Sequence, residues 1–71
     1  MEKQPEIIYL EEEPDFRVIQ KIVGGYFTAI RLPNKKLMYV NEEGELRNLK
    51  YNNQATKLVG YTVYGTALII G

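Results

Sequence analysis

The side chains of this chain that could take part in chemistry are carboxylates, lysines, arginines and tyrosines, because the sequence contains no Ser, Cys, His or Trp. Serine and cysteine triads, histidine acid–base catalysis and zinc–thiolate sites are therefore excluded. Acid–base catalysis would fall to a carboxylate, a lysine or a tyrosine. Glu42 and Glu43 form no ready carboxylate pair unless a turn bends them together, because neighbouring strand residues face opposite ways. We therefore expect a protein without catalytic residues, a bound metal or a cofactor.

Tyrosine is the aromatic residue that this chain uses most, with six tyrosines against two phenylalanines. A tyrosine has a flat face and a polar tip, which suit the edge of a small core or stacking on a nucleobase. The tyrosines alternate along the sequence with Arg31, Arg47, Lys50 and Lys57. We expect most tyrosines to pack at the edge of the core and the rest to form, with these bases, a pocket for a nucleotide-like anion. Single-stranded nucleic acid is a less favoured ligand, because the net charge is zero.

Polar side chains also gather where a second helix is expected to begin. Asn52 is expected to cap that helix. The other polar residues there could hold a ligand at its positive end, with Arg47 nearby in sequence; they are Asn53, Gln54 and Thr56. The residues predicted to bind a ligand are Tyr26, Arg31, Asn41, Glu42, Arg47, Asn52, Thr56 and Tyr61.

The length of 71 residues predicts a single domain, residues 1–71, with a small core. Without cysteine, the chain has no disulfide to stabilise it, so we expect association into a homo-oligomer. No apolar run approaches the roughly 18 residues of a membrane span, and the acidic first residues do not resemble a signal peptide. The cytoplasm is therefore the expected location, and we expect no membrane partner.

The charges balance overall but not along the chain. The chain contains nine Lys and Arg residues and nine Asp and Glu residues, yet residues 1–15 contain six acids and a single base, Lys3. Residues 16–71 hold eight bases against three acids. This distribution permits a local anion site in the basic part, although it is also compatible with an ordinary mixed surface.

The pattern of apolar and turn residues predicts a small α+β domain of order β-α-β-β-α-β. The expected elements are strand 6–11, helix 16–23, strands 26–32 and 37–40, a helix from Asn52 to about Val59, and strand 61–70. This order is that of the ferredoxin-like, split βαβ plan, with both helices on one face of a single sheet. The bare face could then serve assembly or ligand binding. A mixed sheet in another strand order is the alternative.

Glycines mark the ends of these elements. Gly24 is expected to end the first helix, Gly44 to supply a positive φ to a turn, and Gly65 to mark a bulge or a close approach. Gly24 and Gly25 follow a helix, so they do not form a phosphate-binding loop, which precedes one. Residues 45–51 are compatible with helix or loop, and we expect Leu46 and Leu49 to bury part of their surface.

A resemblance to a known family follows from the order of short motifs over about residues 16–71. These are Val23-Gly24-Gly25-Tyr26, Leu32-Pro33, Asn41-Glu42-Glu43-Gly44, Leu46, Asn52-x-x-Ala55-Thr56 and Gly65-Thr66-x-x-Ile69-x-Gly71. In them the chain resembles the domain of unknown function 3846 family, which occurs in phages, plasmids and the bacteria that carry them. Members often have an arginine where this chain has Asn53.

The resemblance implies a phage or mobile-element accessory protein that counters host defence in the host cytoplasm. The favoured expectation is a non-enzymatic homo-oligomer that sequesters a nucleotide-derived immune signal, such as a cyclic dinucleotide or an ADP-ribose derivative. One alternative is a protein–protein inhibitor of a host defence enzyme, whose acidic residues Glu11, Glu12 and Glu13 dock on a basic groove. Another is a small nucleic-acid-binding accessory protein.

Overall fold

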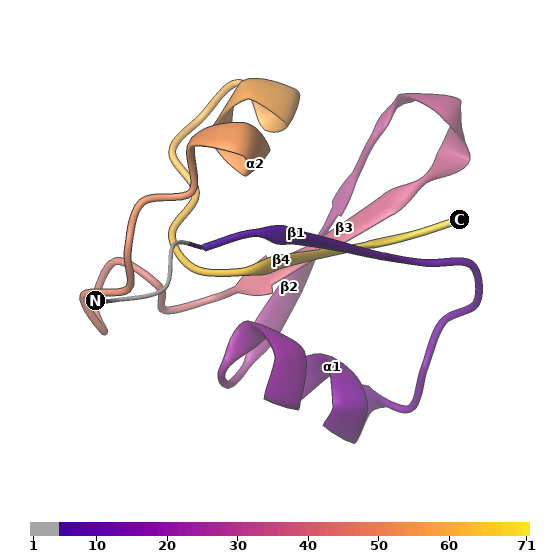
Figure 1. Ribbon diagram of the computed structural model, residues 1–71, viewed down its shortest axis with the longest axis horizontal. Helices are drawn as coiled ribbons and strands as arrows, with labels where there is room; N and C mark the ends of the chain where they lie inside the picture. The colour runs from indigo at the N-terminus through magenta and orange to yellow at the C-terminus, as the bar shows by residue number, and fades with distance from the viewer. Residues whose placement is uncertain (1–4) are drawn as a thin grey trace.

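A computed structural model describes residues 5–71 of the chain, apart from the side chain of Asn34. Its elements are β1 (Ile7–Leu10), α1 (Phe16–Val23), β2 (Phe27–Arg31), a 3-10 helical turn η1 (Pro33–Lys35), β3 (Leu37–Asn41), α2 (Asn53–Val59) and β4 (Ala67–Ile70) (Figure 1). The α+β class and the predicted order of strands and helices are confirmed. Glu2 and Lys3 of the acidic segment lie outside the described residues.

The four strands form one mixed sheet in the order β1-β4-β3-β2. β1 is parallel to β4, whereas β4 and β3, and β3 and β2, are antiparallel. The apolar run Ala67–Leu68–Ile69 is buried in β4 between two neighbouring strands, as expected for a central strand. The last strand is shorter than predicted, because Tyr64 makes only an isolated bridge with Tyr51.

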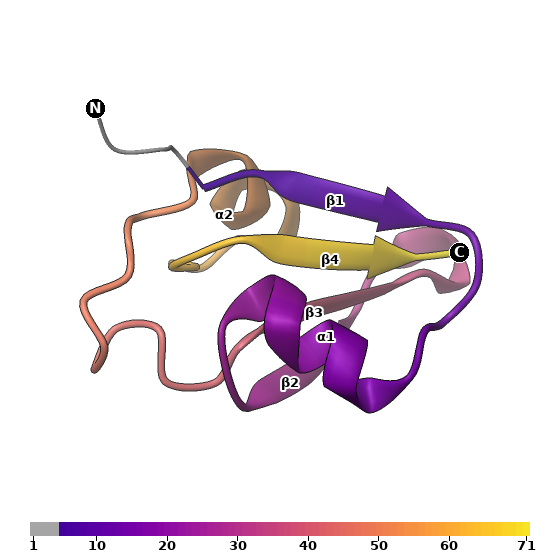
Figure 2. The same cartoon turned by 60° about the horizontal axis from the view of Figure 1, so that its bottom comes forward.

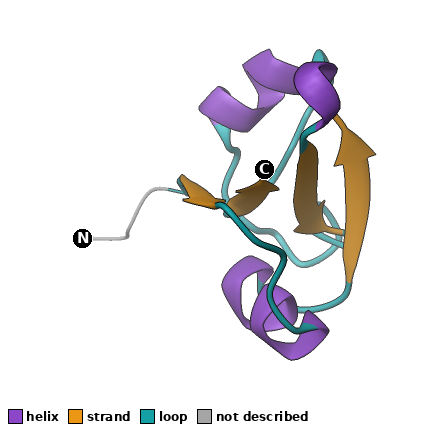
Figure 3. Ribbon diagram, turned by 90° about the vertical axis from the view of Figure 1, so that its right-hand side faces the viewer, coloured by secondary structure: helices purple, strands orange, loops and turns teal. Residues whose placement is uncertain are grey.

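The two helices lie on opposite faces of this sheet, so the prediction that both cover one face was wrong (Figures 1 and 3). On the α2 face, the buried cluster consists of Met38, Val40, Ala55, Val63, Ala67 and Ile69. On the α1 face, it consists of Ile19, Val23, Tyr39 and Leu68. The alternating side chains of β3 and β4 are apolar on both faces, and each face therefore requires a covering helix. Within residues 5–71, the sheet therefore lacks the entirely bare face that was expected, because a helix packs on each side of it.

Both helices begin at a side-chain cap and end at a glycine, and the predicted cap at Asn52 and the predicted end at Gly24 are confirmed. The Asp15 carboxylate accepts a hydrogen bond from the Arg17 N–H at 2.8 Å, and the Asn52 side-chain oxygen accepts one from the Ala55 N–H at 3.0 Å. Gly24 and Gly60 end the two helices with φ of 89° and 82°. Within residues 5–71, no helix has the length and apolar character needed to cross a bilayer.

The loop after β3 differs from its prediction at two residues. Gly44 does not have a positive φ; in this loop Asn48 has one, of 55°. Gly44 is instead required by a close approach, because a Cβ there would lie 3.0 Å from both the Cβ and the carbonyl oxygen of Tyr64. Leu46 is 83% exposed, so the expectation that it is buried was wrong. Leu49 is half-buried against Gly65, whose predicted close approach is confirmed.

Candidate functional site

A groove of about 330 Å³ lies on the α2 face, beside the end of the hairpin where β3 leaves the sheet. Thr28, Ile30 and Val40 of β2 and β3 form its floor. The loop that begins at Asn41 contributes one part of its lining, and the segment that follows α2 contributes another. These further lining residues are Asn41, Glu42, Gly44, Glu45, Tyr61, Thr62, Val63 and Tyr64. The groove is therefore built from β2, from the end of β3 with the loop that follows it, and from the segment after α2.

The segment after α2 is held in place by Asn52 and Thr56. The Thr56 hydroxyl accepts a hydrogen bond from the Val63 N–H at 2.9 Å, and the Val63 carbonyl accepts one from the Asn52 N–H at 2.8 Å. The Asn52 side chain, 1% exposed, also donates to the Gly65 carbonyl at 2.8 Å. Both residues were predicted to bind a ligand, and the structure shows them positioning one side of the groove.

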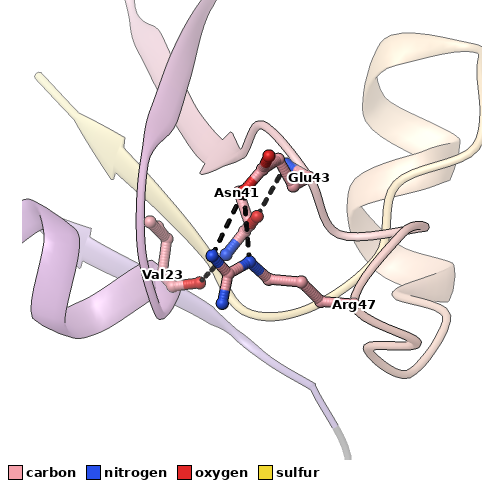
Figure 4. Close-up of polar contacts among 4 residues, drawn as sticks. All are labelled: Val23, Asn41, Glu43 and Arg47. Atoms are coloured by element: carbon pink, nitrogen blue, oxygen red, sulfur yellow. Dashed lines mark hydrogen bonds and ion pairs between the residues drawn. The ribbon is translucent and has the colours of Figure 1, made fainter.

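Asn41 connects the other side of the groove to helix α1 (Figure 4). Its side-chain NH₂ donates to the Val23 carbonyl at 3.1 Å, and its side-chain oxygen accepts from the Glu43 N–H at 2.8 Å. The second bond folds the chain into a local turn just after β3. Asn41 is 7% exposed, so its amide is largely committed to these two bonds.

Arg47 and Glu43 form an ion pair on the outside of the same loop (Figure 4). The Arg47 Nε donates to a Glu43 carboxylate oxygen at 3.2 Å, and a terminal guanidinium nitrogen lies 3.2 Å from that oxygen. The two side chains are 52% and 41% exposed, and pairs this exposed contribute little to stability. Arg47 does not line the groove.

The groove offers an aromatic face, hydroxyls and carboxylates. Tyr61 is 55% exposed, and Tyr64 packs edge-on against Tyr51 with ring centroids 6.3 Å apart. Glu42 and Glu45 are exposed at its margin. Among the residues that the structure describes, no lysine or arginine lines the groove. Such a site can stack a planar ring and accept hydrogen bonds from it, but within one chain it supplies no cation to a phosphate.

The predicted ligand-binding residues are only partly brought together. Asn41, Glu42 and Tyr61 line the groove, whereas Tyr26 and Arg31 do not. The Tyr26 carbonyl accepts a hydrogen bond from the Glu42 N–H at 2.8 Å. The Tyr26 side chain, however, is 65% exposed and does not line the groove. Arg31 pairs with Leu37 at the far end of the hairpin, beside a shallow hollow that it lines with Lys35 and Leu37. Ligand binding by these residues stays a prediction.

Several lining residues were not among those predicted from the sequence, namely Thr28, Glu45, Thr62 and Tyr64. The alternation of β2 already places Thr28 on the same face as Ile30, so its side was predictable. Nothing local to Thr62 or Tyr64 indicates that they lie beside the Asn41 loop. Their place depends on the bonds that Asn52 and Thr56 make to this segment.

Tyr39 ties the acidic segment to the core on the α1 face. Its hydroxyl donates to the Glu13 carboxylate, and its ring packs edge-on against Phe27 with centroids 5.1 Å apart. The hydrogen bond to Glu13, with burial and the nearby negative charge, raises the pKa of Tyr39. Glu11 and Glu12 remain exposed in the turn after β1.

Comparison with known proteins relates the chain to one family. A family model described as a domain of unknown function (DUF3846) matches residues 1–71. No curated protein and no solved structure matches the chain. The match spans the groove and both helices.

Proposed function

We propose that this chain, which belongs to the DUF3846 family, is a non-enzymatic binding protein that sequesters a nucleotide-derived signal. In this proposal it is a phage or mobile-element accessory protein that counters host defence in the host cytoplasm. The observation that best supports binding of a nucleotide-derived signal is the groove lined by Tyr61, Glu42 and Glu45. Among these groups, the aromatic face and the hydrogen-bond acceptors suit a nucleoside.

The size of the groove selects the part of the ligand that it would hold. At about 330 Å³, it lies at the small end of the range of roughly 300–1,000 Å³ for ligand pockets. One nucleoside fits this volume better than a whole dinucleotide. The rest of a larger signal would then extend out of the groove.

The chemistry of the groove gives each part of a nucleoside a partner. The Tyr61 ring would stack on the base, as tyrosines do in nucleic-acid-binding proteins. Glu42 and Glu45 would accept hydrogen bonds from ribose hydroxyls or from an exocyclic amine. Phosphates would point away from these carboxylates, toward cations of another copy in a homo-oligomer. A host defence protein is then not required as a partner.

The test is a thermal-shift and calorimetry panel of adenosine, ADP-ribose and cyclic dinucleotides against the purified chain. Binding to the folded chain raises the melting temperature by an amount that grows with the ratio of ligand concentration to dissociation constant, so at least one nucleoside-containing compound should shift it, and inorganic phosphate alone should not. A flat panel, together with no retention of nucleotides from extracts of infected cells, would exclude the proposal. Product analysis of the same samples tests the non-enzymatic assignment, since the compound should be recovered unchanged.

Two exposed tyrosines provide a matched pair of variants. Tyr61→Ala should weaken binding of the active compound by about 5- to 150-fold, because a stacked base contributes about 1–3 kcal/mol. Tyr26→Ala removes a tyrosine that is similarly exposed but does not line the groove, so it should leave the dissociation constant unchanged. Equal effects of both substitutions would show that the groove is not the binding site.

A further inference from the structure

The two outer strands of the sheet have no strand partner on their outer side within residues 5–71. β1 pairs only with β4, and β2 pairs only with β3. One helix packs on each face of the sheet, and its unpaired backbone lies at the two edges, along β1 and β2 (Figure 2). An open edge is a template for pairing with another strand.

On β1, the outward backbone groups belong to Ile7 and Tyr9. The Glu6 carbonyl accepts a hydrogen bond at 3.0 Å from the N–H of the first residue of β4. The Leu10 carbonyl accepts one at 3.1 Å from the N–H of the residue that follows β4. Successive residues of a strand direct their backbone groups to opposite sides. Ile7 and Tyr9 therefore point theirs away from the sheet, and the Tyr9 side chain is 65% exposed.

On β2, the outward groups belong to Phe27, Ala29 and Arg31. The Tyr26 carbonyl and the Leu32 N–H both make 2.8 Å bonds to the opposite arm of the hairpin. By alternation, Thr28 and Ile30 also bond inward, and the residues between them face outward. Neither edge contains a proline or a bulge that would block pairing.

The directions of the strands make the two edges compatible. β1 is parallel to β4, and two antiparallel steps lead from β4 to β2, so β1 and β2 run the same way. A parallel register that sets Ile7 beside Thr28 and Tyr9 beside Ile30 interleaves the outward backbone groups of both edges. It also keeps these four side chains on the α2 face, where Ile7 and Ile30 already pack. Two copies would then form one continuous sheet.

Charge at the ends of these strands favours the same arrangement. The exposed acids Glu11 and Glu12 follow β1, and the exposed bases Arg31 and Lys35 lie at and after the end of β2. Parallel pairing brings those two ends together, so opposite charges meet. Antiparallel pairing of two β1 edges would instead bring Glu11 of each copy toward the acidic start of the other strand, at Glu6.

We propose that the β2 edge of one copy pairs in parallel with the β1 edge of a second copy, extending the sheet head to tail. Such an interface joins two different surfaces, so it leaves one free edge at each end and continues to further copies or closes into a ring. The assembly needs no ligand in the groove.

The experiment measures molar mass by light scattering and sedimentation across a wide range of protein concentration. The mass of the natural sequence should rise with concentration above the 8.2 kDa of one chain. The acid-reversed variant (Glu11→Lys with Glu12→Lys) and the base-reversed variant (Arg31→Glu with Lys35→Glu) should each remain at monomer mass. Mixing the two should restore assembly, because each variant then offers the other an opposite charge at both edges. Lys57→Glu, an exposed reversal on α2, should assemble like the natural sequence.

Two results would overturn the proposal: a natural sequence that stays monomeric at the highest concentration reached, or a base-reversed variant that assembles as well as the natural one. The second result would indicate pairing of β1 with β1. Circular dichroism confirms that each variant is folded. Ala29→Pro adds a test of the backbone itself, since it removes an outward N–H and spares the hydrogen bonds within the hairpin. It should also abolish assembly.

Discussion

At the scale of single residues, Tyr39 is the titratable group with the most distinctive surroundings in the described part of the chain. Its hydroxyl is partly buried and donates to the Glu13 carboxylate, and this hydrogen bond raises the pKa of Tyr39. A tyrosine whose pKa is raised in the folded state stabilises the fold at pH values below the ordinary tyrosine pKa of about 10. This contribution is lost as the pH rises through the pKa of the folded state. Ionisation removes the donated proton and sets two negative charges side by side.

Tyr39→Phe should therefore change how stability depends on pH. At pH 8 it should lower the free energy of unfolding by about 1 kcal/mol, the net value of a typical hydrogen bond. As the pH rises above about 10, the natural sequence should lose stability more steeply than the variant, as measured by urea unfolding at each pH. The two proteins differ only at residue 39, so the difference between their pH profiles reports on Tyr39. Parallel pH profiles would show that the bond to Glu13 is not maintained in solution.

Asn41 and Asn52 show what sequence can and cannot indicate about a candidate site. Both were predicted to bind a ligand, and Asn52 also to cap a helix. The cap is a local signal and was predictable, since its partner is three residues away. The other bonds join Asn41 to Val23 and Asn52 to Gly65, over 18 and 13 residues. A single sequence does not distinguish an amide that binds a distant carbonyl from one that faces a ligand.

At the scale of elements, the loop from Asn41 depends on a glycine for space rather than for its backbone conformation. Gly44→Ala should destabilise the fold by about 1–3 kcal/mol, as overpacking does, because the new Cβ would lie 3.0 Å from the Cβ and the carbonyl oxygen of Tyr64. Replacing a glycine that has an ordinary φ and open space around it changes the free energy of unfolding in the opposite direction, since alanine there stabilises the fold by about 0.4–1 kcal/mol. Chemical denaturation therefore distinguishes the two cases by sign alone.

Gly60→Ala is the comparison for this loop. Gly60 has a φ of 82°, but a Cβ added there would meet no atom within 4 Å, so its substitution should cost about 1–2 kcal/mol from backbone strain only. It should leave the groove intact, whereas Gly44→Ala should also displace the Asn41 loop from Tyr64. A Gly44→Ala variant as stable as the natural chain would contradict the close approach.

The elements themselves were predictable, but their faces were not. Asp15, Gly24, Asn52 and Gly60 mark the helix ends through contacts within four residues, and such local signals survive in a single sequence. Which face of the sheet each helix covers depends on pairing between β1 and β4, which are nearly 60 residues apart. The sequence did contain one clue: a continuous apolar run such as that of β4 is typical of a strand covered on both faces, which conflicts with placing both helices on one face.

At the scale of the whole molecule, stability comes from two thin cores that share the central strands. α1 has 8 residues and α2 has 7, and isolated helices shorter than about 12–15 residues are marginal in water. Each helix is therefore held by its packing on the sheet. Because alternate residues of β4 serve the two faces, with Leu68 toward α1 and Ala67 and Ile69 toward α2, damage to β4 weakens both layers at once.

A pair of leucine variants tests this dependence. Leu68 is fully buried at the centre of the α1 face, and Leu46 is 83% exposed. A domain of this length is expected to have a total stability of about 4–10 kcal/mol, and Leu68→Ala should remove about 2–5 kcal/mol of it. Leu46→Ala should change stability by less than about 0.5 kcal/mol. Urea unfolding at one low protein concentration, where edge pairing is absent, measures both. If Leu68→Ala lowers the free energy of unfolding by less than Leu46→Ala does, the α1 layer is not a core. The chain would then have to gain its stability through assembly, and its free energy of unfolding would rise with protein concentration.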